Sequence, residues 1–152
     1  MIENFNPKPL ISVITVCFNS EKTIANTIES VINQKYQNIE FIIIDGKSTD
    51  KTFNIIQKYK ANITKIISEK DNGIYDAFNK GLELATGDLI GFVNSDDLLT
   101  PNALELLVKY HNKFPTKDFI FGAVKKHWGI LHGYKPWKIY FSWGFYSSHS
   151  TG

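Results

Sequence analysis

Short, nearly unbroken apolar runs alternate along this chain with longer segments in which apolar residues recur every three or four positions. The runs are rich in Ile, Val and Phe, which is typical of strands buried on both faces of a sheet. The longer segments have the apolar stripe of helices that pack on such a sheet. The pattern predicts strands over residues 10–18, 39–44, 63–68, 89–93 and 119–124.

Helices are predicted between the strands, because each connecting segment has a helical period and a polar start. They span about residues 21–35, 51–60, 74–85 and 101–113. Thr100 and Pro101 favour the start of the last helix, and Gly87 is interpreted as a left-handed cap after the third. The side chains expected to face the core are Ile24, Ile28, Val31, Ile32, Phe53, Ile56, Tyr59, Phe78, Leu82, Ala85, Leu104, Leu107 and Val108.

This alternation of strands and helices predicts an α/β fold, with a mainly parallel sheet and helices on both faces. At 152 residues the chain fits one domain, 1–152, and no internal repeat is visible. From Lys125 onward the period is lost and aromatic residues accumulate. We therefore divide the domain into a core, residues 10–124, and a different, C-terminal region, residues 125–152.

Composition narrows the class of protein. A net charge of +2 is too small to favour a nucleic-acid partner. The single cysteine, Cys17, excludes an internal disulfide and favours a reducing compartment. No segment has the length of a membrane-spanning apolar run, and the first nine residues do not resemble a secretion signal. These features predict a cytoplasmic protein and do not indicate its oligomeric state.

Polar residues collect where the predicted strands end. Because the carboxyl ends of parallel strands meet at one edge of a sheet, these residues should converge on one crevice. Each of them alone is more often ordinary turn chemistry, but four such endings together, rich in acids, indicate a site. The residues are Asn19 after the first strand, Asp45 at the end of the second, Glu69 and Asp71 after the third, and Asp96 and Asp97 after the fourth.

The chemistry of this crevice favours a nucleotide held through a metal ion. Adjacent carboxylates at Asp96 and Asp97 suit Mg²⁺ or Mn²⁺, which would also bind phosphate oxygens. Neither common glycine-rich phosphate-binding motif is present, so a diphosphate would be neutralised by such an ion. Asp45 could accept a hydrogen bond from a ribose hydroxyl or a base N–H. The Phe18 ring could stack on a base, or it could instead be buried in the hydrophobic core.

Three segments together resemble glycosyltransferase family 2. They read ISVITVCFN at residues 11–19, IIDGKSTD at 43–50 and GDLIGFVNSDD at 87–97. A fourth, SEKDNGIYDAFNKG at 68–81, is similar to a branch that builds bacterial surface polysaccharides. The resemblance covers residues 10–123 in the right order and spacing. It implies the Rossmann-like GT-A fold and an inverting, metal-dependent transferase that uses a nucleotide-sugar donor.

The resemblance also implies roles for single residues. The nucleoside, commonly uridine, would be held by Thr15, Cys17, Phe18, Asn19 and Asp45. Asp71 and Asp76 would lie near the nucleotide and sugar, and Asp96 and Asp97 would bind Mg²⁺ or Mn²⁺ on the diphosphate. One position departs from the family, since Asn94 stands where its acidic motif usually begins with Asp. The donor would be a UDP-sugar, and the acceptor a saccharide or a lipid-linked molecule.

The implied reaction is a single displacement at the anomeric carbon, assisted by a carboxylate base. In the family that base lies beyond the metal motif, so residues 125–152 are interpreted as the incomplete start of the acceptor side, and no catalytic base is assigned. His149 resembles a family histidine and is the only candidate catalytic residue. The aromatic stretch 128–146, with Lys125, Lys126, Lys135 and Lys138, could stack on acceptor sugars, contact the inner face of a membrane, or pack as core and lid.

Two alternatives remain open. The chain could be a non-catalytic module that binds a nucleotide-sugar but lacks the base. A receiver-type signalling domain also places acids at strand ends, but it needs a phosphorylatable Asp directly after the third strand. Ser68 and Glu69 occupy that place here, which disfavours the receiver.

Overall fold

The computed structural model describes the side chains of residues 7–120 and the backbone of 121, 124–126, 129–131 and 144–147. The first four strands are β1 (Ile11–Cys17), β2 (Ile39–Asp45), β3 (Lys65–Ser68) and β4 (Leu89–Phe92). The helices are α1 (Ile24–Ile32), α2 (Thr52–Lys58), α3 (Ile74–Leu84) and α4 (Ala103–Lys113), with a 3-10 turn η1 (Lys60–Asn62) after α2. Short strands follow: β5 (Phe119–Phe121), β6 (Val124–Lys126), β7 (Gly129–Leu131) and β8 (Gly144–Ser147).

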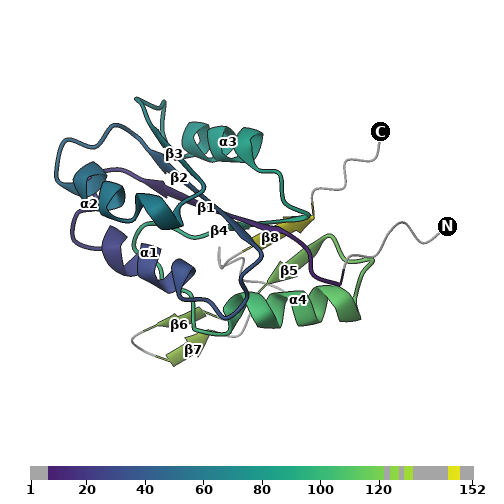
Figure 1. Ribbon diagram of the computed structural model, residues 1–152. Coiled ribbons are helices and arrows are strands. Elements are labelled where there is room, and N and C mark those ends of the chain that lie inside the picture. Colours follow the sequence, from purple (N-terminus) through teal and green to yellow (C-terminus); the bar gives the residue numbers. More distant parts are fainter. Residues whose placement is uncertain (1–6, 122–123, 127–128, 132–143, 148–152) are drawn as a thin grey trace.

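The main sheet has the strand order β3-β2-β1-β4-β8-β5 (Figure 1). Strands β1 to β4 are parallel to one another, and β8 runs antiparallel to both of its neighbours. This confirms the predicted, mainly parallel sheet. The predicted strand 119–124 is shorter than expected, because residues 124–126 leave the sheet and pair with β7 in a separate hairpin.

Helices cover both faces of the sheet, as predicted. Alternate residues of β1 point to opposite faces, because side chains alternate along a strand. Ile11 and Val13 pack in the cluster that α1, α2 and α4 complete, whereas Ile14 and Val16 pack in the cluster beneath α3. The buried helical residues include Ile24, Ile28, Val31, Ile56, Leu104, Leu107 and Val108, all of which were predicted to face the core.

Two helix predictions are corrected. Leu82 is 38% exposed, because α3 rests on the sheet through Ala77 and Gly81, and Leu82 lies about 100° around the helix from Gly81. A side-chain carbon at Gly81 would overlap Ile14, so this glycine lets α3 approach β1 closely. Helix α4 begins at Ala103 with Asn102 before it, two residues later than Pro101.

The interpretation of Gly87 as a left-handed cap is wrong. Helix α3 ends at Leu84, and Ala85 is already extended, with φ −70° and ψ 134°. Gly87 is needed for space: a Cβ there would lie 2.7 Å from the carbonyl oxygen of Leu10 and 2.7 Å from the backbone nitrogen of Ser12. Its N–H also donates to the Ser12 hydroxyl at 2.8 Å.

A buried carboxylate ties this connection to the sheet. Glu40 of β2 accepts hydrogen bonds from the Ser12 hydroxyl at 2.6 Å and from the backbone N–H of Thr86 at 2.8 Å, and it pairs with Lys65 at 3.2 Å. Burial raises the pKa of Glu40, but the bonds from Ser12, Thr86 and Lys65 outweigh burial, so this pKa lies below its ordinary value.

We therefore expect Glu40 to stabilise the fold only while it is ionised. Because its folded-state pKa is lowered, its contribution is present above the ordinary value of 4.5 and is lost as pH falls through the folded-state pKa. Glu40→Gln should lower the free energy of unfolding by about 2 kcal/mol at pH 7, the usual value of a hydrogen bond to a charged group. Urea denaturation of both proteins should show this difference shrinking in acid. A difference that stays the same in acid would contradict the role of the charge.

No helix in the part of the chain that the structure describes is long and apolar enough to cross a membrane. His149 and most of the aromatic stretch 128–146, including Lys135 and Lys138, lie outside the described residues.

Candidate functional site

The loops that follow β1, β2, β3 and β4 meet at one edge of the sheet. The registers place Cys17 opposite Asp45, and Asp45 opposite Ser68. Beyond the strands, the Gly46 N–H donates to the Cys17 carbonyl at 2.9 Å and the Val93 N–H donates to the Ile14 carbonyl at 2.9 Å. The predicted convergence of the strand ends is therefore confirmed.

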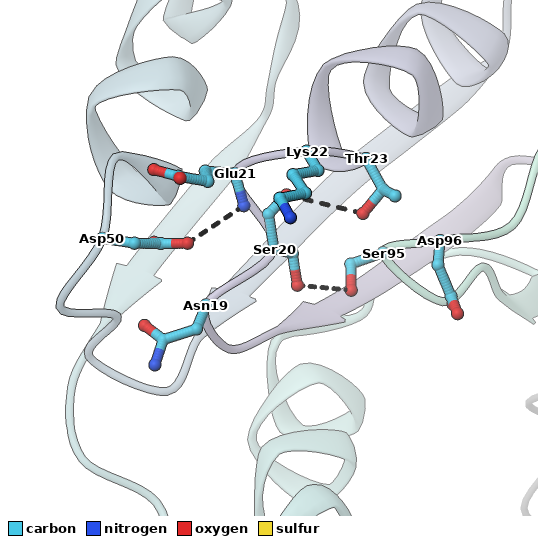
Figure 2. Close-up of a pocket in the computed structure, with 8 residues that line it drawn as sticks. All are labelled: Asn19, Ser20, Glu21, Lys22, Thr23, Asp50, Ser95 and Asp96. Carbon is cyan, nitrogen blue, oxygen red and sulfur yellow. Dashed lines mark hydrogen bonds between the residues drawn. The ribbon is translucent and has the colours of Figure 1, made fainter.

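A cleft of about 450 Å³ lies at this edge (Figure 2). The loop between β1 and α1 forms most of its lining, and the β2–α2 and β4–α4 loops complete it. The hydroxyls of Ser20 and Ser95 lie 2.8 Å apart, and the Asp50 carboxylate accepts a bond from the Glu21 N–H at 3.1 Å. The lining residues are Asn19, Ser20, Glu21, Lys22, Thr23, Asp50, Ser95 and Asp96.

Asp45 is fully buried beside this cleft, and the protein itself already provides donors to both of its oxygens. Its Oδ1 accepts a hydrogen bond from the Ser48 hydroxyl. Its Oδ2 accepts one from the Ser68 hydroxyl at 2.6 Å. The Cys17 thiol lies 3.8 Å from Oδ1. Burial, together with the neighbouring Asp45, raises the pKa of Cys17, so the thiol stays neutral. Both residues occupy the predicted strand end, and their binding roles stay predictions.

Phe18 and Asn19 follow β1 on the open side. The Phe18 side chain is 60% exposed, so it is not part of the core and a base could lie against it. Asn19 has a left-handed backbone, with φ 50°. Its side-chain oxygen accepts a bond from the Thr49 N–H at 2.9 Å. Thr15 is different: it is completely buried within β1, does not line the cleft, and its hydroxyl has no partner among the described residues.

Asp71 reaches the Asp45 loop, although neither Asp71 nor Asp76 lines the cleft. The Asp71 carboxylate occupies the space that a side chain at Gly46 would need. Asp76, in the first turn of α3, accepts from the Asn72 N–H at 3.0 Å and pairs with Lys80 at 3.3 Å. These contacts lower the pKa of Asp76, the Asn72 bond most strongly. The structure thus brings Asp71 beside the loop that follows Asp45 and directs Asp76 toward Lys80.

Asp96 and Asp97 end the turn after β4. Asp96 is exposed and lines the cleft. The Asp97 carboxylate accepts a bond from the Asn94 side-chain amide at 3.0 Å. The Thr27 hydroxyl of α1 lies 2.9 Å from the Ser95 carbonyl and 3.0 Å from the Asp97 carbonyl, which holds the turn against the helix. Asn94, the departure from the family motif, therefore positions Asp97.

The donors at this turn fit a divalent cation shared with a phosphate-bearing ligand. Within residues 7–120, no group of three or more His, Cys, Asp or Glu side chains is placed to hold a metal by itself. Mg²⁺ commonly takes only one or two carboxylates and completes its shell with water and substrate phosphates. Asp96 and Asp97 provide that number of carboxylates.

Sequence reasoning missed several residues of this edge. It interpreted the segment after Asn19 only as a helix start, yet Ser20 and Lys22 line the cleft. It also interpreted residues 45–50 as a turn and cap, yet Ser48 and Asp50 bond to the neighbouring loop. Their position directly after a buried strand was the available signal.

Comparison with known proteins agrees with this geometry. The family model described as glycosyl transferase family 2 matches residues 12–151. Chondroitin synthase of Escherichia coli is 38% identical over 107 residues, covering 69% of this chain and 16% of that protein. The E. coli UDP-Glc:alpha-D-GlcNAc-diphosphoundecaprenol beta-1,3-glucosyltransferase WfaP is 36% identical over 128 residues, covering 76% of this chain and 50% of that protein. The chain thus spans half or less of these relatives.

A solved structure of similar fold carries a nucleotide. Staphylococcus aureus TarS 1-349 in complex with UDP superimposes with a TM-score of 0.68 and 28% identity. The match covers 73% of this chain and 34% of that one.

Proposed function

This chain belongs to glycosyltransferase family 2, and from that premise we propose that its cleft binds a nucleotide-sugar donor, a UDP-sugar, for transfer to a saccharide or lipid-linked acceptor. The fold agrees with the predicted GT-A class, as the likeness to TarS shows. The observation that carries the proposal is the convergence of four strand-end loops, with Phe18, Asp45, Asp71 and Asp96, on one edge.

The nucleoside end of the donor would occupy the side formed by β1 and β2. The exposed Phe18 ring offers an apolar face for a base. Asp45 would accept a hydrogen bond from the nucleoside beside those from Ser48 and Ser68, because the two oxygens of a carboxylate offer about four lone-pair sites. The choice of UDP is supported by TarS, which has been solved with UDP and with UDP-GlcNAc, and by the UDP-Glc in the name of WfaP.

The diphosphate end would lie toward the β4–α4 turn. Asp96 and Asp97 would hold a Mg²⁺ or Mn²⁺ ion, which when bound withdraws charge from the departing diphosphate. Lys22 lines the same cleft and would add a positive charge near the phosphates. The Ser20 and Ser95 hydroxyls at the cleft are further hydrogen-bond partners for phosphate oxygens.

We propose that transfer inverts the anomeric centre, by attack of an acceptor hydroxyl on the face opposite the diphosphate. A base on the acceptor side would take the hydroxyl proton. The role of His149, a contact with the phosphates or the acceptor, stays a prediction. The cytoplasmic location and the contact with a membrane also stay predictions.

Titration calorimetry tests the donor proposal. We expect UDP to bind much more tightly with Mn²⁺ than with EDTA, because the two carboxylates repel a bare diphosphate. ADP serves as the control for base recognition and should bind more weakly. UDP-GlcNAc or UDP-Glc hydrolysis then separates a transferase from a binding module, since a module would bind without turnover. Absence of any nucleoside diphosphate binding in Mn²⁺ would overturn the proposal.

A further inference from the structure

Two residues with a left-handed backbone lie in the loops that follow β1 and β2. Within the described part of the chain, the non-glycine residues with positive φ are Asn19, at 50°, and Lys47, at 61°. The left-handed conformation costs free energy in residues that have a Cβ. Other contacts must therefore stabilise the backbone at these two positions. Both positions lie next to one side chain, Ser48.

The Ser48 hydroxyl joins the two loops that carry this strain. It donates to Asp45 Oδ1 and at the same time accepts the backbone N–H of Asn19, with 2.8 Å between nitrogen and oxygen. The Ser48 N–H also donates to Asp45 at 3.2 Å. A second link runs beside it, because the Asn19 side-chain oxygen accepts from the Thr49 N–H and hydroxyl at 2.9 and 3.3 Å.

We propose that Ser48 is a positioning residue of the donor site. Its hydroxyl fixes the loop that carries Phe18 relative to Asp45, so that the aromatic face and the carboxylate are in place before the nucleoside arrives. This inference rests on the proposed function and deepens it. The link needs one group that donates a hydrogen bond to the Asp45 carboxylate and accepts one from the Asn19 N–H. The hydroxyls of Ser and Thr are the smallest side-chain groups that do both.

The hydrogen bonds of Ser48 and Ser68 distinguish a link between the two loops from a bond that only orients the Asp45 carboxylate. The carboxylate has a separate hydroxyl donor, Ser68, on its other oxygen, at 2.6 Å. In the hydrogen bonds that the structure describes for these side chains, Ser68 bonds to Asp45 and does not bond to Asn19, whereas Ser48 bonds to both. Loss of the Ser48 hydroxyl therefore removes the acceptor of the Asn19 N–H and leaves only the Thr49 link to Asn19 beside it, whereas loss of Ser68 leaves both links intact.

The pair Ser48→Ala and Ser68→Ala forms a matched test. Each removes one hydroxyl bond to the same carboxylate, so equal losses are expected if only Asp45 matters. We expect Ser48→Ala to weaken UDP binding in Mn²⁺ by about tenfold or more, because two bonds are lost at once, and Ser68→Ala by about threefold or less. Ser48→Thr should recover most of the affinity, since it restores the hydroxyl.

Calorimetry with UDP and Mn²⁺, run well below each variant's melting temperature, gives the outcome. Equal affinity losses in the two alanine variants, unchanged affinity in Ser48→Ala, or no recovery in Ser48→Thr would each overturn the proposal. If Ser48→Ala does not fold, Ser48→Cys replaces it, because a thiol is a weak donor and acceptor, and the same ordering is expected. Failure of the wild-type protein to bind UDP would instead count against the proposed function.

Discussion

Asp97→Ala is expected to remove Mn²⁺-dependent UDP binding and to lower sugar transfer at least about 100-fold, with little change in melting temperature. Charge stabilisation of a leaving phosphate by a bound cation contributes several kcal/mol, and about 2.7 kcal/mol already corresponds to a factor of 100. The fold should tolerate the change, because the described side-chain bond of Asp97 is one contact with Asn94 and the Thr27 hydroxyl contacts backbone carbonyls.

Two further variants sharpen this test. Asp97→Asn keeps the size and an oxygen for the Asn94 bond but removes the charge, so it should lose Mn²⁺ dependence like the alanine variant. Glu105→Gln removes one carboxylate from the exposed surface of α4 and should bind UDP like the wild type. UDP affinity in Asp97→Ala that equals the wild-type value with Mn²⁺ present would refute the metal assignment.

The largest loss of stability is expected for Gly87→Ala, about 3 kcal/mol, the upper part of the usual cost of overpacking. The added methyl would overlap the Leu10 carbonyl and the Ser12 backbone, which belong to the chain entering and forming β1. These atoms cannot move without breaking the pairing of β1 with β4, where Ile11 lies opposite Leu89. Urea denaturation should show a lower midpoint with an unchanged slope.

Gly81→Ala is the comparison for this variant. Its methyl would meet the Ile14 side chain and not backbone, and alanine favours a helix over glycine by about 1 kcal/mol. We therefore expect a smaller loss at Gly81. An equal or larger loss there would mean that helix packing, and not the close approach at Gly87, limits stability.

The sequence predicted where the candidate site lies in the fold, but it predicted few of the contacts between its side chains. Asp45, Asp71 and Asp96 lie at the predicted edge because each ends or follows a parallel strand, and parallel strands end at a common edge. The burial of Thr15 follows from the predicted buried strand, whereas the exposure of Phe18, included in that strand, was not determined by the local pattern. Phe18 lies just beyond β1, where the neighbouring loops and not the sheet surround the chain.

Non-local geometry also explains the other differences. Strand β8 lies between β4 and β5, so the fifth predicted strand does not pair with its nearest neighbour in sequence. The sequence predicted Ser48 only as part of a turn, whereas in the structure its hydroxyl accepts a hydrogen bond from the Asn19 N–H. In each case the partner lies many residues away, and periodicity carries no information about such partners.

The sequence by itself determined the alternation of strands and helices, the parallel core of the sheet and the edge where its acidic residues gather. Those features follow from local hydrophobic period and from the rules that connect parallel strands. Only the tertiary structure decided that Gly87 serves close packing, that Glu40 holds the α3–β4 connection, and that one serine joins Asn19 to Asp45. These depend on distances between segments, which are set when the helices pack on the sheet.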